Sequence, residues 1–154
     1  MIAAALLALA AAAQEPAAPA PNPANADYHF RYLNALDPAL GWRRTLSGLR
    51  YRKVSGNGRG PRPSATDTVT IHYVGRFIDG TEFDSSVARG APATFPLPNL
   101  IRGWQEGVPL MSVGDRYEFA IPYTLAYGAN GRGPIPGGAT LVFTIDLLAM
   151  PAQP

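Results

Sequence analysis

The chain has 154 residues and a formal net charge of only +2, which suits one domain with a short extension. It contains no Cys, so disulfides, thiol nucleophiles and thiolate metal sites are excluded, and its 2 His lie far apart in sequence. With 16 Gly and 16 Pro, turns are abundant, which favours a strand-rich fold over a helical bundle. We expect neither a metal ion nor a cofactor.

The N-terminal residues are expected to direct export. Residues 1–13 are almost wholly apolar and end in three Ala, small residues typical of a signal-peptidase site. This run is too short to cross a hydrocarbon core of about 30 Å as a helix. It predicts a signal peptide cleaved near Ala13, although no Lys or Arg precedes it, and a disordered Ala-rich leader is the alternative. We expect a periplasmic or secreted protein, without a lipid anchor because there is no Cys.

Two further segments are expected before the main domain. Residues 14–26 are rich in Pro and Ala and predict an extended linker. Residues 27–45 predict a short helix and a connector, with Asn25 as the N-cap and Asp37-Pro38 and Gly41 at the end. One face of this helix is apolar at i, i+4 and i+8, namely Tyr28, Tyr32 and Leu36. That face would dock on the domain or, alternatively, join a dimer.

Basic residues gather in residues 43–62, where no acidic residue occurs. The seven are Arg43, Arg44, Arg50, Arg52, Lys53, Arg59 and Arg62. The favoured interpretation is a solvated basic edge that aids solubility. The alternative is contact with acidic partners or with anionic lipid headgroups, a peripheral membrane contact. Nucleic-acid binding is not expected, because only Trp42 and Tyr51 could stack on bases.

From Leu49 onward the apolar period is two, which predicts strands with one inward face. The clearest alternation lies in residues 49–52, 68–73, 116–121 and 140–147. The dipeptide Asp79-Gly80 between two such runs predicts a hairpin. One short helix is expected between Asn99, as its cap, and Gly107, with an apolar face formed by Ile101, Trp104 and Val108. Antiparallel strands wrapped around one helix make an α+β domain.

Separate segments also supply five aromatic residues and one carboxylate, namely Tyr73, Phe83, Trp104, Tyr127, Phe143 and Asp84. A basin of rings with few polar groups suits an apolar, uncharged ligand such as a prolyl ring. Taken singly, each inward aromatic residue would more often fill the core, and Asp84 would more often be a surface turn residue.

Six segments, in order between Leu46 and Leu148, resemble those of the FKBP-type peptidyl-prolyl cis–trans isomerases. They are Ile71-His72-Tyr73-Val74-Gly75, Asp79-Gly80-Thr81-Glu82-Phe83-Asp84-Ser85-Ser86, Ile101-Arg102-Gly103-Trp104, Met111-Ser112-Val113-Gly114, Ala126-Tyr127-Gly128 and Ala139-Thr140-Leu141-Val142-Phe143. The resemblance implies an isomerase domain over residues 46–150. It also implies a five-stranded antiparallel sheet curled around a short helix, with the ligand between them.

The resemblance further implies the residues of the site. Asp84, Tyr127 and Tyr73 would be catalytic, with Asp84 held by Tyr73 or Arg89. The substrate-binding residues would be Phe83, Arg89, Leu100, Ile101, Trp104, Ile135 and Phe143. Trp104 would form the floor, and the Ile101 N–H and the Tyr127 hydroxyl would donate to substrate carbonyls. Ala93 stands where many members carry an aromatic residue, which leaves that rim more open.

By the same resemblance, the activity would be isomerisation of X–Pro bonds in folding polypeptides, and macrolides such as FK506 and rapamycin would bind in the same groove. The chemistry fits, because rotation about the peptide bond needs no nucleophile or metal. The rival hypothesis is a non-catalytic chaperone that holds unfolded chains in this groove, and the open rim at Ala93 gives it some support.

Overall fold

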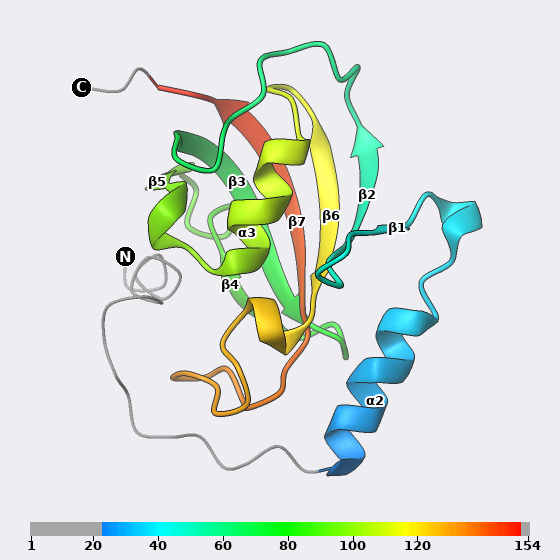
Figure 1. Ribbon diagram of the computed structural model, residues 1–154. Coiled ribbons are helices and arrows are strands. Elements are labelled where there is room, and N and C mark those ends of the chain that lie inside the picture. Colours follow the sequence, from blue (N-terminus) through cyan, green and yellow to red (C-terminus); the bar gives the residue numbers. More distant parts are fainter. Residues whose placement is uncertain (1–22, 152–154) are drawn as a thin grey trace.

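A computed structural model of the chain describes residues 23–151 (Figure 1). The predicted signal peptide and most of the predicted linker lie outside the described residues. No helix within residues 23–151 is long and apolar enough to cross a membrane.

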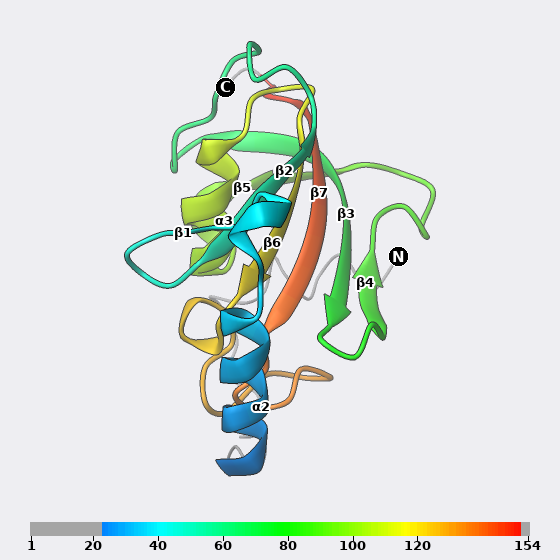
Figure 2. The ribbon, with the colours of Figure 1, turned by 90° about the vertical axis from the view of Figure 1, so that its right-hand side faces the viewer.

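The core of the fold is one antiparallel sheet, which curls around a short helix (Figures 1 and 2). The strand order is β1-β2-β6-β7-β3-β4, and β5 also pairs with β3. The strands are β1 (Arg43–Arg44), β2 (Arg50–Ser55), β3 (Thr68–Phe77), β4 (Glu82–Ser85), β5 (Ala93–Pro96), β6 (Arg116–Ile121) and β7 (Leu141–Ala149).

The predicted five-stranded α+β architecture is confirmed, with one refinement at each edge. β4 and β5 share the fifth position, because β4 pairs with residues 74–76 of β3 and β5 pairs with residues 68–71. At the other edge, the two-residue strand β1 pairs with β2, so the sheet begins slightly before the predicted domain start at residue 46. The predicted hairpin also forms, with Gly80 at φ +91°.

The helix α3 (Arg102–Gly107) lies on the concave face of the sheet and approaches it closely (Figure 2). A Cβ on Gly103 would lie 2.5 Å from Cγ2 of Ile121, and one on Gly107 would lie 2.7 Å from Cε1 of Phe119. Both contacts are shorter than packed carbon atoms allow, so the two glycines let α3 sit directly on β6. This approach buries Trp104, which is 1% exposed.

The expected cap of this helix was wrong. Asn99 is the last residue of the 3-10 helix η2 (Leu97–Asn99), and Ile101 precedes α3 as its N-cap residue without a side-chain capping bond. Gly107 does end α3, but in a right-handed conformation, and the chain continues into the 3-10 helix η3 (Val108–Leu110). Two Pro residues in these flanking turns favour short 3-10 segments over a longer α-helix.

The N-terminal helix α2 (Pro23–Asn34) begins and ends earlier than predicted. Its first residues fall inside the predicted linker, and Asn25 lies within the helix rather than at its cap. Pro is favoured in the first turn, and the alanines that follow are strong helix formers, so the low-complexity composition concealed a helix start. Asp37 instead caps the 3-10 helix η1 (Pro38–Leu40), and Gly41 ends that turn at φ +93°.

The predicted apolar face of α2 was partly wrong as well. Tyr28 is 57% exposed, whereas His29, Tyr32, Leu33 and Leu36 are half-buried. His29 is the polar contact of this face, because its Nδ1 accepts a hydrogen bond from the Thr140 N–H at 3.1 Å. Docking on the domain is therefore the arrangement observed for α2.

Because of the His29–Thr140 hydrogen bond, we expect the local stability of this contact to depend on pH. Burial lowers the pKa of His29, so the folded state takes up its proton at lower pH than the unfolded chain, whose ordinary value is about 6.5. Stability from this contact is complete above about pH 6.5 and is lost as the pH falls below it. Hydrogen exchange of the Thr140 amide, corrected for the intrinsic rate, should show decreasing protection between pH 7.5 and 5. A His29→Gln variant, which keeps an acceptor but does not titrate, should show constant protection. Equal pH profiles in the two proteins would contradict the prediction.

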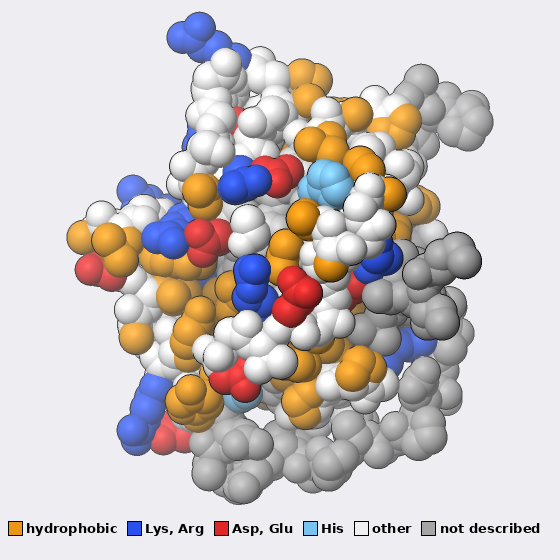
Figure 3. All heavy atoms as spheres, turned by 180° about the vertical axis from the view of Figure 1, so that it is seen from behind, with side chains coloured by type: hydrophobic (Ala, Val, Ile, Leu, Met, Phe, Trp, Pro, Cys, Tyr) orange, Lys and Arg blue, Asp and Glu red, His pale blue; other side chains and the backbone are white. Residues whose placement is uncertain are grey.

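The convex face of the sheet carries opposite charges side by side, among polar and hydrophobic side chains (Figure 3). Arg116 binds both carboxylate oxygens of Asp146 at 2.6 and 2.9 Å, and Arg52 binds Glu118 at 3.0 Å. Since these pairs are partly exposed, each adds little to the free energy of unfolding. The fully buried positions of β3 and β7 alternate with the outward ones and face the concave side of the sheet.

Candidate functional site

A cluster of aromatic rings fills the space between α3 and the concave face, and Trp104 lies at its centre. The indole centroid is 5.2 Å from that of Tyr73 and 5.1 Å from that of Phe143, with interplanar angles of 79° and 88°. Phe83 extends the cluster toward the edge of the sheet, because its centroid is 5.6 Å from that of Phe143. Such edge-to-face contacts are the favoured geometry of aromatic pairs. The alternation in β3 and β7 positions Tyr73 and Phe143, and helix α3 positions Trp104.

The carboxylate of Asp84 lies beside this cluster and has two partners. The Tyr73 hydroxyl donates to its Oδ2 at 2.6 Å, and Arg89 binds its Oδ1 at 2.5 Å. Arg89 also donates to the Tyr73 hydroxyl at 2.9 Å, so the three side chains form a closed triangle. Asp84 is 4% exposed, and a buried carboxylate is costly unless it is paired in this way. Both partners suggested by the resemblance are therefore present.

The triangle sets the protonation of Tyr73. Burial raises the pKa of the Tyr73 hydroxyl, and its hydrogen bond to Asp84 raises it further. Tyr73 consequently stays neutral at physiological pH and remains a donor to the carboxylate. The guanidinium carbon of Arg89 also lies 5.6 Å from the Tyr73 ring centroid, which adds a cation–π contact.

Three predicted residues lie around the rings on connecting segments. Leu100 and Ile101 are buried just before α3, and Ile135 is buried in the loop between β6 and β7. The Ile101 carbonyl accepts hydrogen bonds from the N–H groups of Trp104 and Gln105. Its own N–H precedes the helix, whose first N–H groups have no partner within the helix itself.

Tyr127 is half-buried and packs against the same core. Burial raises the pKa of its hydroxyl, the positive charge of Arg132 lowers it, and the negative charge of Asp84 raises it again. Asp84 is thus one of the charges that raise the pKa of the Tyr127 hydroxyl. All ten predicted site residues belong to the concave side of the domain or to the loops beside it.

Two residues of this region were missed in the sequence. Phe95 on β5 is 7% exposed, and its ring centroid lies 6.2 Å from that of Tyr73 and 6.3 Å from that of Trp104. The alternation of Phe95 and Leu97 with polar or Pro neighbours was a weak strand signal that could have revealed it.

Ser86, the second missed residue, is fully buried where β4 leaves the edge of β3. Its Oγ accepts the Tyr73 N–H at 2.8 Å, and its N–H donates to the Tyr73 carbonyl at 3.0 Å. The main chain of Tyr73 is thereby satisfied at a point where neither edge strand pairs with it. In the sequence, only its place in the motif that ends Ser85-Ser86 indicated its importance, because a single Ser does not contribute to a pattern of apolar residues.

This arrangement can enclose an apolar group against rings and present a few donors at its margin. A neutral Tyr hydroxyl, an Arg-bound carboxylate and a helix-start N–H lie near one apolar surface. No part of it supplies an activated nucleophile. Preorganised dipoles of this kind stabilise a charge distribution that changes during a reaction.

The comparisons with known proteins agree with this geometry. The family profile described as FKBP-type peptidyl-prolyl cis-trans isomerase matches residues 60–148. The chain is 53% identical over 119 residues to the FKBP-type peptidyl-prolyl cis-trans isomerase FkpA of Aeromonas hydrophila, covering 77% of this chain and 44% of that protein. It is 49% identical over 119 residues to the FKBP-type 22 kDa peptidyl-prolyl cis-trans isomerase of Escherichia coli, covering 77% of this chain and 57% of that protein. The chain thus spans about half the length of these curated relatives.

A solved structure shares the fold over nearly its whole length. The crystal structure of a peptidyl-prolyl cis-trans isomerase from Pseudomonas syringae superposes with a TM-score of 0.77 at 32% sequence identity, covering 86% of this chain and 98% of that one. The profile match and the relatives lead to the same conclusion as the site: this chain belongs to the FKBP-type peptidyl-prolyl cis-trans isomerase family.

Proposed function

We propose that the chain catalyses cis–trans isomerisation of X–Pro bonds in polypeptides, with the proline ring enclosed by the cluster around Trp104. The observation that carries the proposal is the buried Tyr73–Asp84–Arg89 triangle set directly against that ring cluster. The indole Nε1 of Trp104 adds support, because it is buried without a hydrogen-bond partner among the described residues, and a bound substrate is one explanation for such a group.

The physical task is to lower a rotational barrier. The barrier is roughly 18–20 kcal/mol, and uncatalysed X–Pro exchange takes tens to hundreds of seconds. An apolar enclosure that fits the twisted amide better than either planar isomer accelerates exchange tenfold for about every 1.4 kcal/mol of differential binding. In this proposal the Ile101 N–H and the Tyr127 hydroxyl bind substrate carbonyls, while Asp84 acts on the dipole of the rotating amide.

A protease-coupled assay with a proline tetrapeptide tests the activity. The slow phase, which reports the cis fraction, should accelerate in proportion to protein concentration, and rapamycin or FK506 should suppress the acceleration. Equal slow phases with and without protein would contradict catalysis.

Replacement of Trp104 tests the floor of the site. A Trp104→Leu variant should bind an uncharged acetylated and amidated Ala-Leu-Pro-Phe peptide roughly 5- to 30-fold more weakly, because aromatic contacts contribute about 0.5–1.5 kcal/mol each beyond area burial. A Phe119→Leu variant is the matched control. Phe119 is equally buried but is not among the predicted site residues, and its ring stacks on that of Tyr117. Equal loss of affinity in both variants would show that Trp104 acts only through stability.

We also propose that the chain is exported, on the strength of its apolar N-terminal residues and their Ala-rich end. Mass determination of the exported form should then place its first residue near Gln14. A form that retains residues 1–13 after export would contradict the proposed cleavage.

A further inference from the structure

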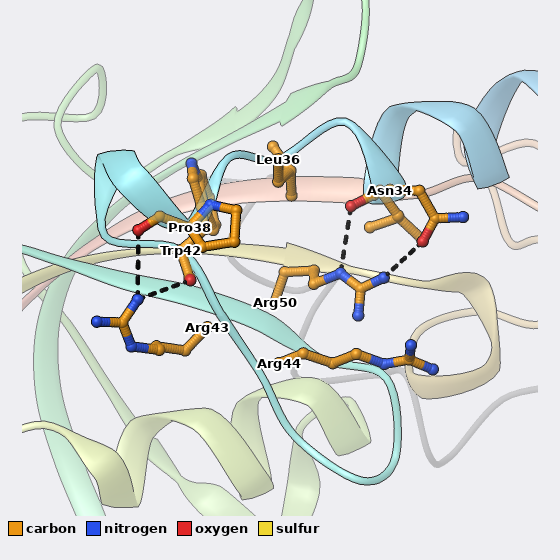
Figure 4. Close-up of a pocket in the computed structure, with 8 residues that line it drawn as sticks. Asn34, Leu36, Pro38, Trp42, Arg43, Arg44 and Arg50 are labelled. Carbon is orange, nitrogen blue, oxygen red and sulfur yellow. Dashed lines mark hydrogen bonds between the residues drawn. The ribbon is translucent and has the colours of Figure 1, made fainter.

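A pocket of about 200 Å³ lies on the other edge of the sheet from the candidate site, between the end of α2, η1 and the β1–β2 hairpin (Figure 4). Its walls are of two kinds. Leu33, Leu36, Pro38 and Trp42 are apolar, and Arg44 and Arg50 are cationic. A second hollow of about 220 Å³ also touches Arg44 and Arg50, so the two guanidinium groups lie between two recesses.

The two arginines are direct cross-strand neighbours, because Arg44 on β1 pairs with Arg50 on β2. Like charges in this position repel each other. Neither guanidinium forms an ion pair with any of residues 23–151. Burial lowers the pKa of Arg50, and the charge of Arg44 lowers it further. The edge therefore holds two close cations without a compensating anion in the described part of the chain.

Arg50 is fixed in place by the end of α2. Its Nε donates to the Leu33 carbonyl at 3.2 Å and its Nη2 donates to Oδ1 of Asn34 at 3.0 Å, so it caps the negative end of the helix (Figure 4). Its third nitrogen, Nη1, is buried and has no hydrogen-bond partner within residues 23–151. The residue as a whole is only 9% exposed. A held guanidinium with one unpaired nitrogen loses little conformational freedom on binding an anion.

The other basic residues of this stretch are engaged differently. Arg52 pairs with Glu118 and lies over the Trp42 ring at 5.0 Å, and Arg43 donates to the carbonyls of Pro38 and Trp42. The predicted solvated basic edge is thus uneven, with most cations engaged and the Arg44–Arg50 pair left uncompensated.

We propose that this pocket binds a carboxylate of a polypeptide together with an adjoining apolar side chain. The oxyanion would accept from Nη1 of Arg50 and from Arg44, and the apolar group would contact Leu36 and Trp42. The volume suits one residue, since a cavity of about 150 Å³ holds a benzene ring. A bare phosphate would leave the apolar wall in water. The carboxylate can belong to a chain terminus or to an Asp or Glu beside an apolar residue.

Titration of the full chain, followed by the NMR signals of the arginine Nε–H groups, tests this site. The probes are an acetylated Gly-Gly-Leu peptide with a free C-terminal carboxylate, the same peptide amidated, an amidated peptide with an internal Glu-Leu pair, inorganic phosphate, and vesicles that contain anionic phosphatidylglycerol. We expect the free acid to shift the Arg50 signal and to bind at least tenfold more tightly than its amide. The internal Glu-Leu peptide then decides whether a side-chain carboxylate also binds.

Two variants complete the test. Arg44→Gln, at an exposed residue, should weaken binding of the free acid at least tenfold without lowering the free energy of unfolding. Arg59→Gln is the matched control, because it removes the same charge from an exposed site outside the pocket and should leave binding unchanged.

Four results would overturn the proposal. They are equal binding of acid and amide, binding of phosphate as tight as that of the peptide acid, equal effects of the two variants, and binding only to vesicles of anionic phosphatidylglycerol. The isomerase assay is independent of all four, because the proposed active site lies at the opposite edge of the sheet.

Discussion

An Asp84→Val variant is expected to lower kcat/KM for isomerisation about 10- to 100-fold. The change removes the acceptor of the Tyr73 hydroxyl and of Arg89, and hydrogen bonds to a charged group are worth about 1.5–3 kcal/mol each. Each 1.4 kcal/mol lost from the transition state is about tenfold in rate. The protease-coupled assay measures this directly.

The fold should tolerate the same change better than the activity does. Breaking a fully buried ion pair costs about 3–5 kcal/mol, but the Arg89 side chain is 18% exposed and can turn toward water. We therefore expect the free energy of unfolding to fall by about 1–2 kcal/mol, measured with guanidinium chloride. Nearly all of the variant protein would therefore still be folded at 25 °C.

Asp146→Val is the matched control, since it also removes a carboxylate that binds an arginine. Asp146 pairs with Arg116 on the convex face, away from the rings. Its loss should change kcat/KM less than twofold and the stability by less than about 1 kcal/mol. Equal activity of Asp84→Val and Asp146→Val would remove Asp84 from the proposed mechanism.

The Asp84→Val protein also separates isomerisation from the rival chaperone hypothesis. A variant that no longer accelerates isomerisation but still suppresses aggregation of an unfolded protein would favour a holding function in the same groove. Parallel loss of both activities would favour the isomerase.

The second large effect is expected at Gly103, where an Ala should destabilise the protein by about 1–3 kcal/mol. Ala is the better helix former by about 1 kcal/mol, so propensity alone predicts a gain. Packing outweighs it, because the new Cβ would meet Cγ2 of Ile121 at 2.5 Å and its Cδ1 at 2.8 Å. Ile121 is itself fully buried and has little room to move. Displacement of α3 would also move Trp104 and lower the isomerase activity.

A double-mutant cycle identifies the cause. Ile121→Ala removes the atoms that clash, so Gly103→Ala should cost less, or even stabilise, in the Ile121→Ala background. Arg102→Ala, one residue earlier and exposed, should stay within about 0.5 kcal/mol of the parent. Additive costs in the cycle, measured by guanidinium chloride unfolding, would show that contact with Ile121 is not the reason for a glycine.

The sequence predicted the strands well, because a period of two survives in β3, β6 and β7 with few interruptions. It predicted helix limits poorly for a physical reason. The segment around Pro23 was assigned to a linker by composition, yet Pro is compatible with a first helical turn. β1 was not predictable, since two successive arginines show no alternation and form a strand only by pairing with β2.

The sequence motifs indicated which residues form the candidate site, but they did not indicate which of these residues contact one another. Nothing in the sequence decides that Arg89 rather than solvent binds Asp84, because that choice depends on how the loop after β4 folds back. Phe95 was missed because its strand has only four residues and ends at Pro96. The pocket at Arg50 needed the docked α2, whose end supplies two of its partners.

The two edges of the sheet are poorly suited to pairing with a strand of another polypeptide. At one end, the outermost strand β1 has only two residues, Arg43 and Arg44, and at the other the outer position is divided between the short strands β4 and β5. Short or interrupted borders with charged side chains hinder recruitment of a foreign strand. In the proposed function, a polypeptide would therefore be bound in the cluster around Trp104 through its proline ring and carbonyl groups, without adding a strand to the sheet.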